Sequence, residues 1–167
     1  MADYHSFVKP SSKKRGLTTT PNYVIIPTES EVIKMVFIRK ATTADYRSIA
    51  RSLANKNIPY ITPNHARTDI ENGNLYVIED NGTILAQCAL VHEPQFGYHA
   101  IKRMVVYNRK NLGCGLAQRF LSYFTAMPYT LGCTPWADNE RMQYLLRKNG
   151  FEYEYTFCEN YQLFIRI

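Results

Sequence analysis

Lys110-Asn111-Leu112-Gly113-Cys114-Gly115 is the segment that decides the fold. An apolar run, Met104 to Val106, precedes it and apolar residues at helical spacing follow it, which predicts a strand, a glycine-containing loop and a helix start. Glycine lets the backbone turn tightly and leaves its N–H groups unobstructed. The first N–H groups of a helix lack intrahelical acceptors and carry partial positive charge, so such a helix start binds phosphate readily. The segment therefore predicts a pyrophosphate-bearing cofactor, although plain strand–helix turns have the same pattern.

A second segment follows in a fixed order, and it adds to the specificity of the first. The matching residues are Lys110, Gly113 and Gly115 in the loop, and Asn139, Gly150 and Phe151 at the two ends of a later predicted helix. In this order and spacing the chain resembles the GNAT family of acetyl-CoA-dependent N-acetyltransferases, from about Phe37 to the end of the sequence. The family's loop begins with Gln or Arg, and here Lys110 stands in that place.

The order of predicted elements agrees with this resemblance. Strands are expected at 36–39, 75–78, 83–92, 98–107, 129–133, 151–158 and 161–167, and helices from Thr43, at 65–71, at 113–126 and from Asp138 to 149. Asp80-Asn81-Gly82 is a strong hairpin signal. The predicted fold is mixed α/β (α+β), with a mostly antiparallel central sheet and helices on both faces, which is the GNAT fold that the resemblance implies.

Composition sets the domain organisation. The 167 residues, 46% of them apolar, suffice for one domain, which we place at 35–167. Residues 1–34 are polar, basic and rich in Pro and Ser, and predict a flexible N-terminal extension. The net charge of +6 could reflect a solvated surface or attraction to an anionic partner such as CoA or nucleic acid; its spread along the chain favours the solvated surface.

Several classes are disfavoured by the sequence. There is neither an apolar run near the ~20 residues of a membrane span nor an apolar N-terminal signal, which predicts a cytoplasmic protein. The four cysteines are scattered, so we expect free thiols and no metal site. A monomer or a homodimer is expected, with no membrane partner.

The resemblance implies a binding mode for acetyl-CoA. Backbone groups of one strand would hold the pantetheine arm, a backbone N–H near Val105 would bind the thioester oxygen, and the glycine loop would hold the pyrophosphate. Asn139 could bond the pantetheine arm or serve only its own helix. The expected cofactor-binding residues are Met104, Val105, Val106, Lys110, Asn111, Leu112, Gly113, Cys114, Gly115, Leu116, Asn139 and Leu146.

The proton-transfer groups are less well defined. Candidates for the general base are Glu93, His92 and His99, near the turn between two predicted central strands. Many family members carry a Tyr acid where this chain has Leu146, and Tyr144 lies on a different face of the helix. Tyr60, Asn64 and His65 could line the acceptor site by analogy of fold.

The predicted function is transfer of an acetyl group from acetyl-CoA to a primary amine by direct attack in a ternary complex. The alternative is a non-catalytic or regulatory acyl-CoA-binding module that engages a protein or nucleic-acid partner, a reading that Leu146 favours.

Overall fold

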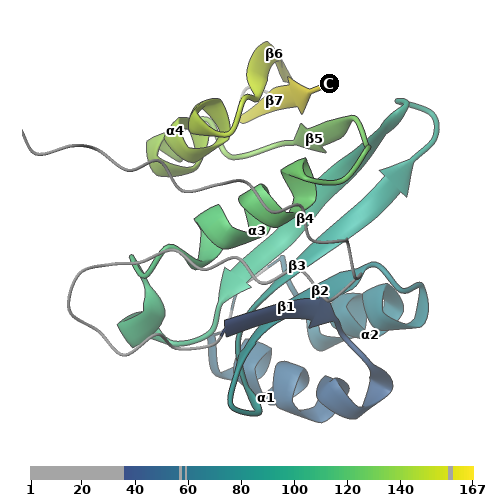
Figure 1. Cartoon of the computed structure of the whole chain (residues 1–167), viewed down its shortest axis with the longest axis vertical. Helices are drawn as coiled ribbons and strands as arrows, with labels where there is room; N and C mark the ends of the chain where they lie inside the picture. Colours follow the sequence, from purple (N-terminus) through teal and green to yellow (C-terminus); the bar gives the residue numbers. More distant parts are fainter. Residues whose placement is uncertain (1–35, 57, 59, 158–159) are drawn as a thin grey trace, which may run out of the picture.

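The computed structural model describes residues 36–167 apart from residues 57, 59, 158 and 159 (Figure 1). The strands are β1 (Val36–Lys40), β2 (Leu75–Asp80), β3 (Thr83–Glu93), β4 (Tyr98–Val106), β5 (Leu131–Cys133), β6 (Glu152–Phe157) and β7 (Tyr161–Arg166). The helices are α1 (Tyr46–Lys56), α2 (Pro63–Glu71), α3 (Leu116–Thr125) and α4 (Glu140–Lys148), with short 3-10 turns at Thr43–Asp45 and Arg109–Asn111. The predicted extension, 1–34, lies outside the described residues.

The strands form one sheet in the order β1-β2-β3-β4-β5-β7-β6. Neighbouring strands are antiparallel except for β4 and β5, which run parallel and pair only from His99↔Leu131 to Ile101↔Cys133. β5 ends there, whereas β4 continues to Val106, so none of the described strands pairs with the second half of β4 on that side. We call this opening between β4 and β5 the splay.

Helices cover both faces of the sheet, as predicted (Figure 1). On one face α3 packs through Phe120 and Phe124 against sheet residues such as Phe164, and all three side chains are fully buried. On the other face α1 packs through Ile49 and Leu53 over residues of β2 and β3. Burial of each of these large side chains contributes about 1.5–3 kcal/mol, so both apolar faces hold the helices in place.

Two predicted helix N-caps are wrong by one residue: the first prediction is one residue too late and the other one residue too early. The first helical turn begins after Thr42 rather than Thr43, because the Asp45 carboxylate accepts the Thr42 N–H at 2.7 Å. α4 is capped by Asn139 rather than Asp138, since Asn139 Oδ1 accepts the Met142 N–H at 3.1 Å.

α2 also begins earlier than predicted, at Pro63 instead of His65. Proline fits the first helical position because its missing N–H would have no acceptor there. Thr62 precedes it as the cap, and its hydroxyl accepts the His65 N–H at 3.4 Å.

The register shifts in three strand pairs, β2–β3, β3–β4 and β6–β7, and the shifts in β4 and β6 change which side chains face which side of the sheet. In β4, Arg103 and Met104 lie opposite the single residue Cys88, and Arg103 has a left-handed φ of 52°. The side chains of Lys102 and Arg103 consequently both lie on the face of the sheet that carries α1 and α2. In β6 the register shifts between Tyr153 and Tyr155. None of the described helices is long and apolar enough to cross a membrane.

Candidate active site

The strand–loop–helix unit predicted at 104–116 is present. β4 ends at Val106, a 3-10 turn covers Arg109–Asn111, and α3 begins at Leu116 with Gly115 as its N-cap. Gly113 and Gly115 have φ values of 89° and 73°, which side-chain-bearing residues rarely adopt. The two glycines are therefore required by the shape of the loop.

The donors of this loop divide into two groups. The N–H groups of Lys110, Asn111 and Cys114 already donate within the loop, to Asn108 Oδ1 at 3.0 Å, Asn108 O at 3.0 Å and Asn111 O at 3.3 Å. Among the described residues, the N–H groups of Gly113 and Gly115 have no acceptor. These two groups and the first turn of α3 are thus the donors available to an anion.

The side chains of the loop contribute unequally. Leu112 and Cys114 are exposed, and Leu116 is buried in the core, so Leu116 offers only its backbone. Lys110 brings a positive charge to the exposed turn.

Arg141 on α4 is a further candidate that no sequence motif indicates. A Cβ placed on Gly113 would lie 3.9 Å from Arg141 Nη2, so the guanidinium group stands beside the loop. Arg141 is exposed in the first turn of α4, where a basic side chain in the sequence could have suggested a binding role. Only the fold, however, brings that turn close to the loop.

The splay exposes backbone groups of β4 in an alternating pattern. The Tyr107 N–H donates to Leu85 O at 2.9 Å, around the pair Ala86↔Val106. In an antiparallel ladder this makes Ala86↔Val106 a pair whose own N–H and C=O groups point away from each other. The N–H groups of Met104 and Val106 therefore point into the splay, whereas that of Val105 points to β3.

Asn139 has a confirmed structural role as the N-cap of α4. Its Oδ1 is engaged by Met142, which leaves its amide N–H groups as donors. A bond from this amide to the pantetheine arm stays a prediction.

Leu146, predicted to contact the cofactor, has a side chain that is fully buried in the core beneath α3 and α4, packed with residues such as Phe120 and Phe164. A larger ring at this position would have to enter that packed core. Contact of Leu146 with a cofactor stays a prediction. Tyr144 is 64% exposed and lies on another face of α4, as predicted.

The three candidate bases are not brought together. In the β3–β4 ladder Glu93 lies opposite Tyr98, and His92 lies opposite His99. Since successive side chains of a strand alternate, Glu93 and the two histidines are on opposite faces of the sheet.

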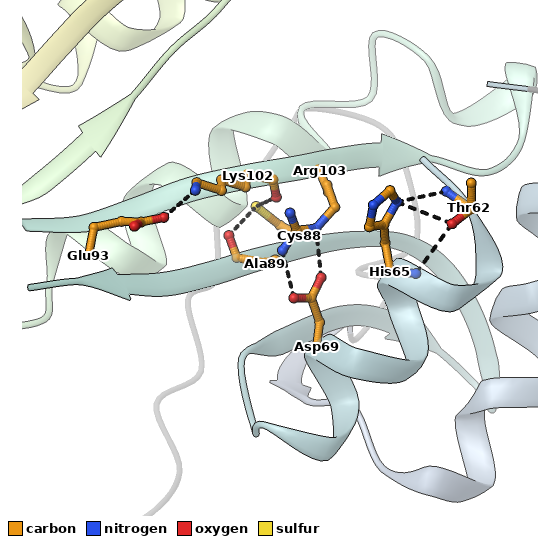
Figure 2. A network of polar contacts seen from close by, with 8 residues as sticks. All are labelled: Thr62, His65, Asp69, Cys88, Ala89, Glu93, Lys102 and Arg103. Atoms are coloured by element: carbon orange, nitrogen blue, oxygen red, sulfur yellow. Dashed lines mark hydrogen bonds and ion pairs between the residues drawn. The ribbon is translucent and has the colours of Figure 1, made fainter. Parts of the chain in front are cut away.

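Glu93 is held by an ion pair with Lys102 Nζ (Figure 2). Gln95 Nε2 also donates a hydrogen bond to Glu93, at 2.8 Å. The hydrogen bond from Lys102 lowers the pKa of Glu93 below its usual value. Glu93 is therefore ionised at neutral pH and a weak proton acceptor.

His99 is stacked between two rings. Its centroid lies 4.7 Å from that of His92 and 4.1 Å from that of Tyr129. Burial, with a smaller effect of His92, lowers the pKa of His99, so the imidazole is neutral at neutral pH. It lies on the α3 face, away from Glu93.

A second ion pair lies beside the first. Arg103 donates to the Asp69 carboxylate from Nε at 2.7 Å and from Nη2 at 2.6 Å, and Figure 2 shows Arg103 turned from β4 towards α2. Asp69 is buried, and this bidentate pair ties α2 to the bulge of β4. His65, expected near the acceptor site, is engaged with its own cap, since Thr62 N–H donates to His65 Nδ1 at 3.2 Å.

A cavity of about 350 Å³ opens where the pairing of β4 and β5 ends. It is lined by Glu93, Phe96, Tyr98, Ala100, Ile101, Lys102, Gly132, Cys133, Thr134, Tyr155, Phe157 and Leu163. We call it the aromatic cavity. Of the three candidate bases, only Glu93 lines it.

The two buried thiols of the sheet, Cys88 and Cys133, are poor nucleophiles. Cys133 ends β5 at the splay, and burial raises its pKa to about 12. Burial also raises the pKa of Cys88 well above its usual value. Cys88, Cys114 and Cys133 are free thiols, and Cys158 lies outside the described residues.

The chain has the fold of the GNAT acetyltransferases. Its sheet opens at the splay between the parallel strands β4 and β5, a glycine loop leads into α3, and helices cover both faces. Solved structures with this fold match the chain closely in shape. A GNAT-family acetyltransferase from Streptococcus agalactiae matches with a TM-score of 0.66 and 21% identity, over 87% of this chain and 98% of its own.

Two further structures agree. A GNAT-family acetyltransferase from Bacillus cereus has a TM-score of 0.66 and 19% identity, over 79% of this chain and 96% of its own. A spermidine N-acetyltransferase chimera from Vibrio cholerae and hSSAT has a TM-score of 0.58 and 15% identity, over 78% of this chain and 93% of its own. No protein-family model and no curated protein sequence matches this chain.

Proposed function

We propose that this chain is an N-acetyltransferase that transfers the acetyl group of acetyl-CoA to a primary amine in a ternary complex. The proposal rests on two features that follow one another along the chain. The N–H groups at the end of β4 point into the splay, and the glycine loop after β4 has N–H groups for which no described residue is an acceptor. Met104 and Val106 supply the former, and Gly113 and Gly115 supply the latter.

The residues present fit this cosubstrate. The backbone groups of Met104 and Val106 would bond the amides of the pantetheine arm as an added strand does. The donors at Gly113, Gly115 and the first turn of α3 would hold the pyrophosphate, with Lys110 and Arg141 adding positive charge. A side chain on either glycine would require a strained backbone in this cradle.

When bound, acetyl-CoA supplies an activated acyl group on a thiol of pKa about 8.5, which is a fair leaving group. An N–H of β4 in the splay would donate to the thioester oxygen, and the geometry favours Met104 or Val106 over Val105. Holding the amine beside the thioester can by itself supply several kcal/mol, up to about 7–11 in the best cases.

The chain's own side chains support direct attack rather than an acyl-enzyme. Cys133, the thiol at the splay, stays protonated because its pKa is raised to about 12, and it is a poor acyl acceptor. Glu93 is ionised and paired with Lys102, so we expect it to orient the amine or a water rather than to take a proton with high efficiency. The amine would lose its proton to water before it attacks, and water would protonate the departing thiolate.

The alternative function, a non-catalytic acyl-CoA-binding module, is favoured by two observations. The family's acid position is the buried Leu146, and the only candidate base in the cavity is neutralised by Lys102. Both functions require binding of CoA, and only the proposed one requires turnover.

The test measures CoA binding by calorimetry and CoA release from acetyl-CoA in the presence of amines with the full chain. Amine-dependent release of CoA with formation of the N-acetyl product is expected. Binding of CoA without release for any amine would establish the alternative. Absence of CoA binding would overturn both.

A further inference from the structure

We infer that the acceptor is a primary amine carried on an aromatic, aryl-alkyl body, and that its ring binds in the aromatic cavity. The inference rests on the proposed acetyltransferase function and names the substrate class of the same site. It is carried by the position of the cavity, by its walls and by its charge.

The cavity adjoins the place where the reaction would occur. Its floor is formed by Ala100 to Lys102 on β4, by Gly132 and Cys133 on β5, and by Thr134 directly after β5, where pairing ends and the splay begins. Tyr98, Ala100 and Lys102 share the face opposite α3, because they alternate with His99 and Ile101. An amine seated there would approach the splay from the face that does not carry the glycine-loop helix.

One wall is built by Tyr98 and Phe96. A Cβ on Gly132 would lie 2.5 Å from Tyr98 Cε2, so the Tyr98 ring lies directly across the backbone of β5. Phe96 stacks on Tyr98 with centroids 5.8 Å apart and planes 15° apart. Because Gly132 has no side chain, the Tyr98 ring can lie against the backbone of β5 and form a flat aromatic surface where this wall meets the floor of the cavity.

The other wall is built by the edge strand β6. Tyr153 contacts Phe164 of the core beneath α3 and α4, with centroids 5.9 Å apart, whereas Tyr155, after the bulge, lines the cavity. Phe157 follows on the same wall, 6.3 Å from Tyr155. A ring entering between these walls would meet aromatic faces or edges on both sides, the arrangement that aromatic pairs prefer.

The aromatic surface continues outside the cavity. Tyr161 stacks on Phe157 at 5.6 Å, Trp136 lies 4.5 Å from Tyr161, and Tyr60 lies 6.2 Å from Trp136. This row joins the cavity to the connection between α1 and α2. The chain contains one tryptophan, so Trp136 reports on this row alone.

The charges of the cavity argue against a polyamine. The charged side chains that line it are Glu93 and Lys102, and they neutralise each other. Arg103, the next residue along β4, is neutralised by Asp69. A polycation needs a carboxylate for each ammonium group that leaves water, and the lining residues offer none unpaired. An aryl-alkyl amine needs to place only one amino group near the polar floor.

The experiment compares kcat/KM for 2-phenylethylamine and for spermidine with the full chain and acetyl-CoA. We expect 2-phenylethylamine to be preferred by about tenfold or more. Tyr155→Ala should lower kcat/KM for 2-phenylethylamine by about tenfold, mainly through KM. Tyr153→Ala is the matched control, because it removes the same side chain from the same strand on the opposite face, and it should leave kcat/KM unchanged.

A binding measurement separates this inference from the proposed function. Titration of 2-phenylethylamine in the presence of CoA, followed by Trp136 fluorescence and by calorimetry, requires no turnover. Binding that is lost in Tyr155→Ala and kept in Tyr153→Ala supports the inference even if no amine is acetylated. Faster acetylation of spermidine than of 2-phenylethylamine, or no binding of 2-phenylethylamine, would overturn the inference and leave the acetyltransferase function to its own test.

Discussion

Arg103 on β4 and Asp69 on α2 form a bidentate ion pair, with N···O distances of 2.7 and 2.6 Å. Arg103 itself has a left-handed φ, which no other described non-glycine residue of β4 has. The pair holds the bulge that directs the N–H groups of Met104 and Val106 into the splay. Asp69 is buried, so neither partner can be removed without leaving the other poorly solvated.

Asp69→Asn should therefore lower the free energy of unfolding by about 3 kcal/mol, since it leaves the Arg103 charge unpaired. Chemical denaturation measures the effect. Asp138→Asn, at an exposed residue of the same type, should change the value by less than about 0.5 kcal/mol. Equal small effects of both variants would show that the pair does not stabilise the bulge.

Gly113→Asp should weaken CoA binding at least about tenfold, because a side chain and a negative charge would occupy the phosphate cradle. The backbone strain of such a change is reproduced by Gly82→Asp, since Gly82 also has a left-handed φ, 78°, but lies in the β2–β3 hairpin. Calorimetry with CoA should show a loss only in the first variant. A similar loss in both would mean that strain, and not the cradle, is responsible.

Arg141→Ala should weaken CoA binding several-fold, and the loss should shrink as salt is added, because the guanidinium group acts through its charge beside Gly113. Lys148→Ala removes a charge from the other end of the same helix and should have little effect. If Arg141→Ala and the unchanged protein bound CoA with equal affinity at low salt, Arg141 would not be part of the CoA site.

The rate of acetyl transfer should rise with pH between about pH 6 and 9 and follow deprotonation of the acceptor amine. The pKa of Glu93 is lowered and that of His99 is also lowered, so neither group changes charge in most of this range. Glu93→Gln and His99→Gln should keep the shape of the profile. Loss of an inflection in either variant would identify that residue as the base.

Leu146→Tyr should destabilise the fold by about 1–3 kcal/mol, because a larger ring must enter a filled core. Tyr144→Phe, on the exposed face of α4, should leave stability and turnover unchanged. Thermal and chemical denaturation measure the first effect. A stable Leu146→Tyr variant with higher turnover would show that the helix leaves room at the cofactor after all.

The sequence was sufficient wherever a local rule determines the structure. Gly113 and Gly115 specify left-handed turns, Asp80-Asn81-Gly82 specifies a hairpin, and the apolar periodicity specifies two covered faces of a sheet. Even the separation of Glu93 from His92 follows from the alternation of neighbouring strand residues.

What the sequence did not predict depends on partners far along the chain. The bulge at Arg103 is fixed by Asp69, 34 residues away, and the weak basicity of Glu93 is caused by Lys102. Arg141 reaches the glycine loop only because α4 packs beside α3. No periodic pattern carries these contacts, because each depends on how separate elements meet in space.

The bulge in β6 places residues with different roles on one strand: the residue before it packs against the core, and the residues after it line the cavity. Tyr153 is tied to the core, whereas Tyr155 and Phe157 face a cavity and contribute little to the packing of the sheet. Residues 155 and 157 could thus be exchanged with little effect on the stability of the domain. Under the proposed function, changes confined to this outermost strand would alter which acceptor the protein uses.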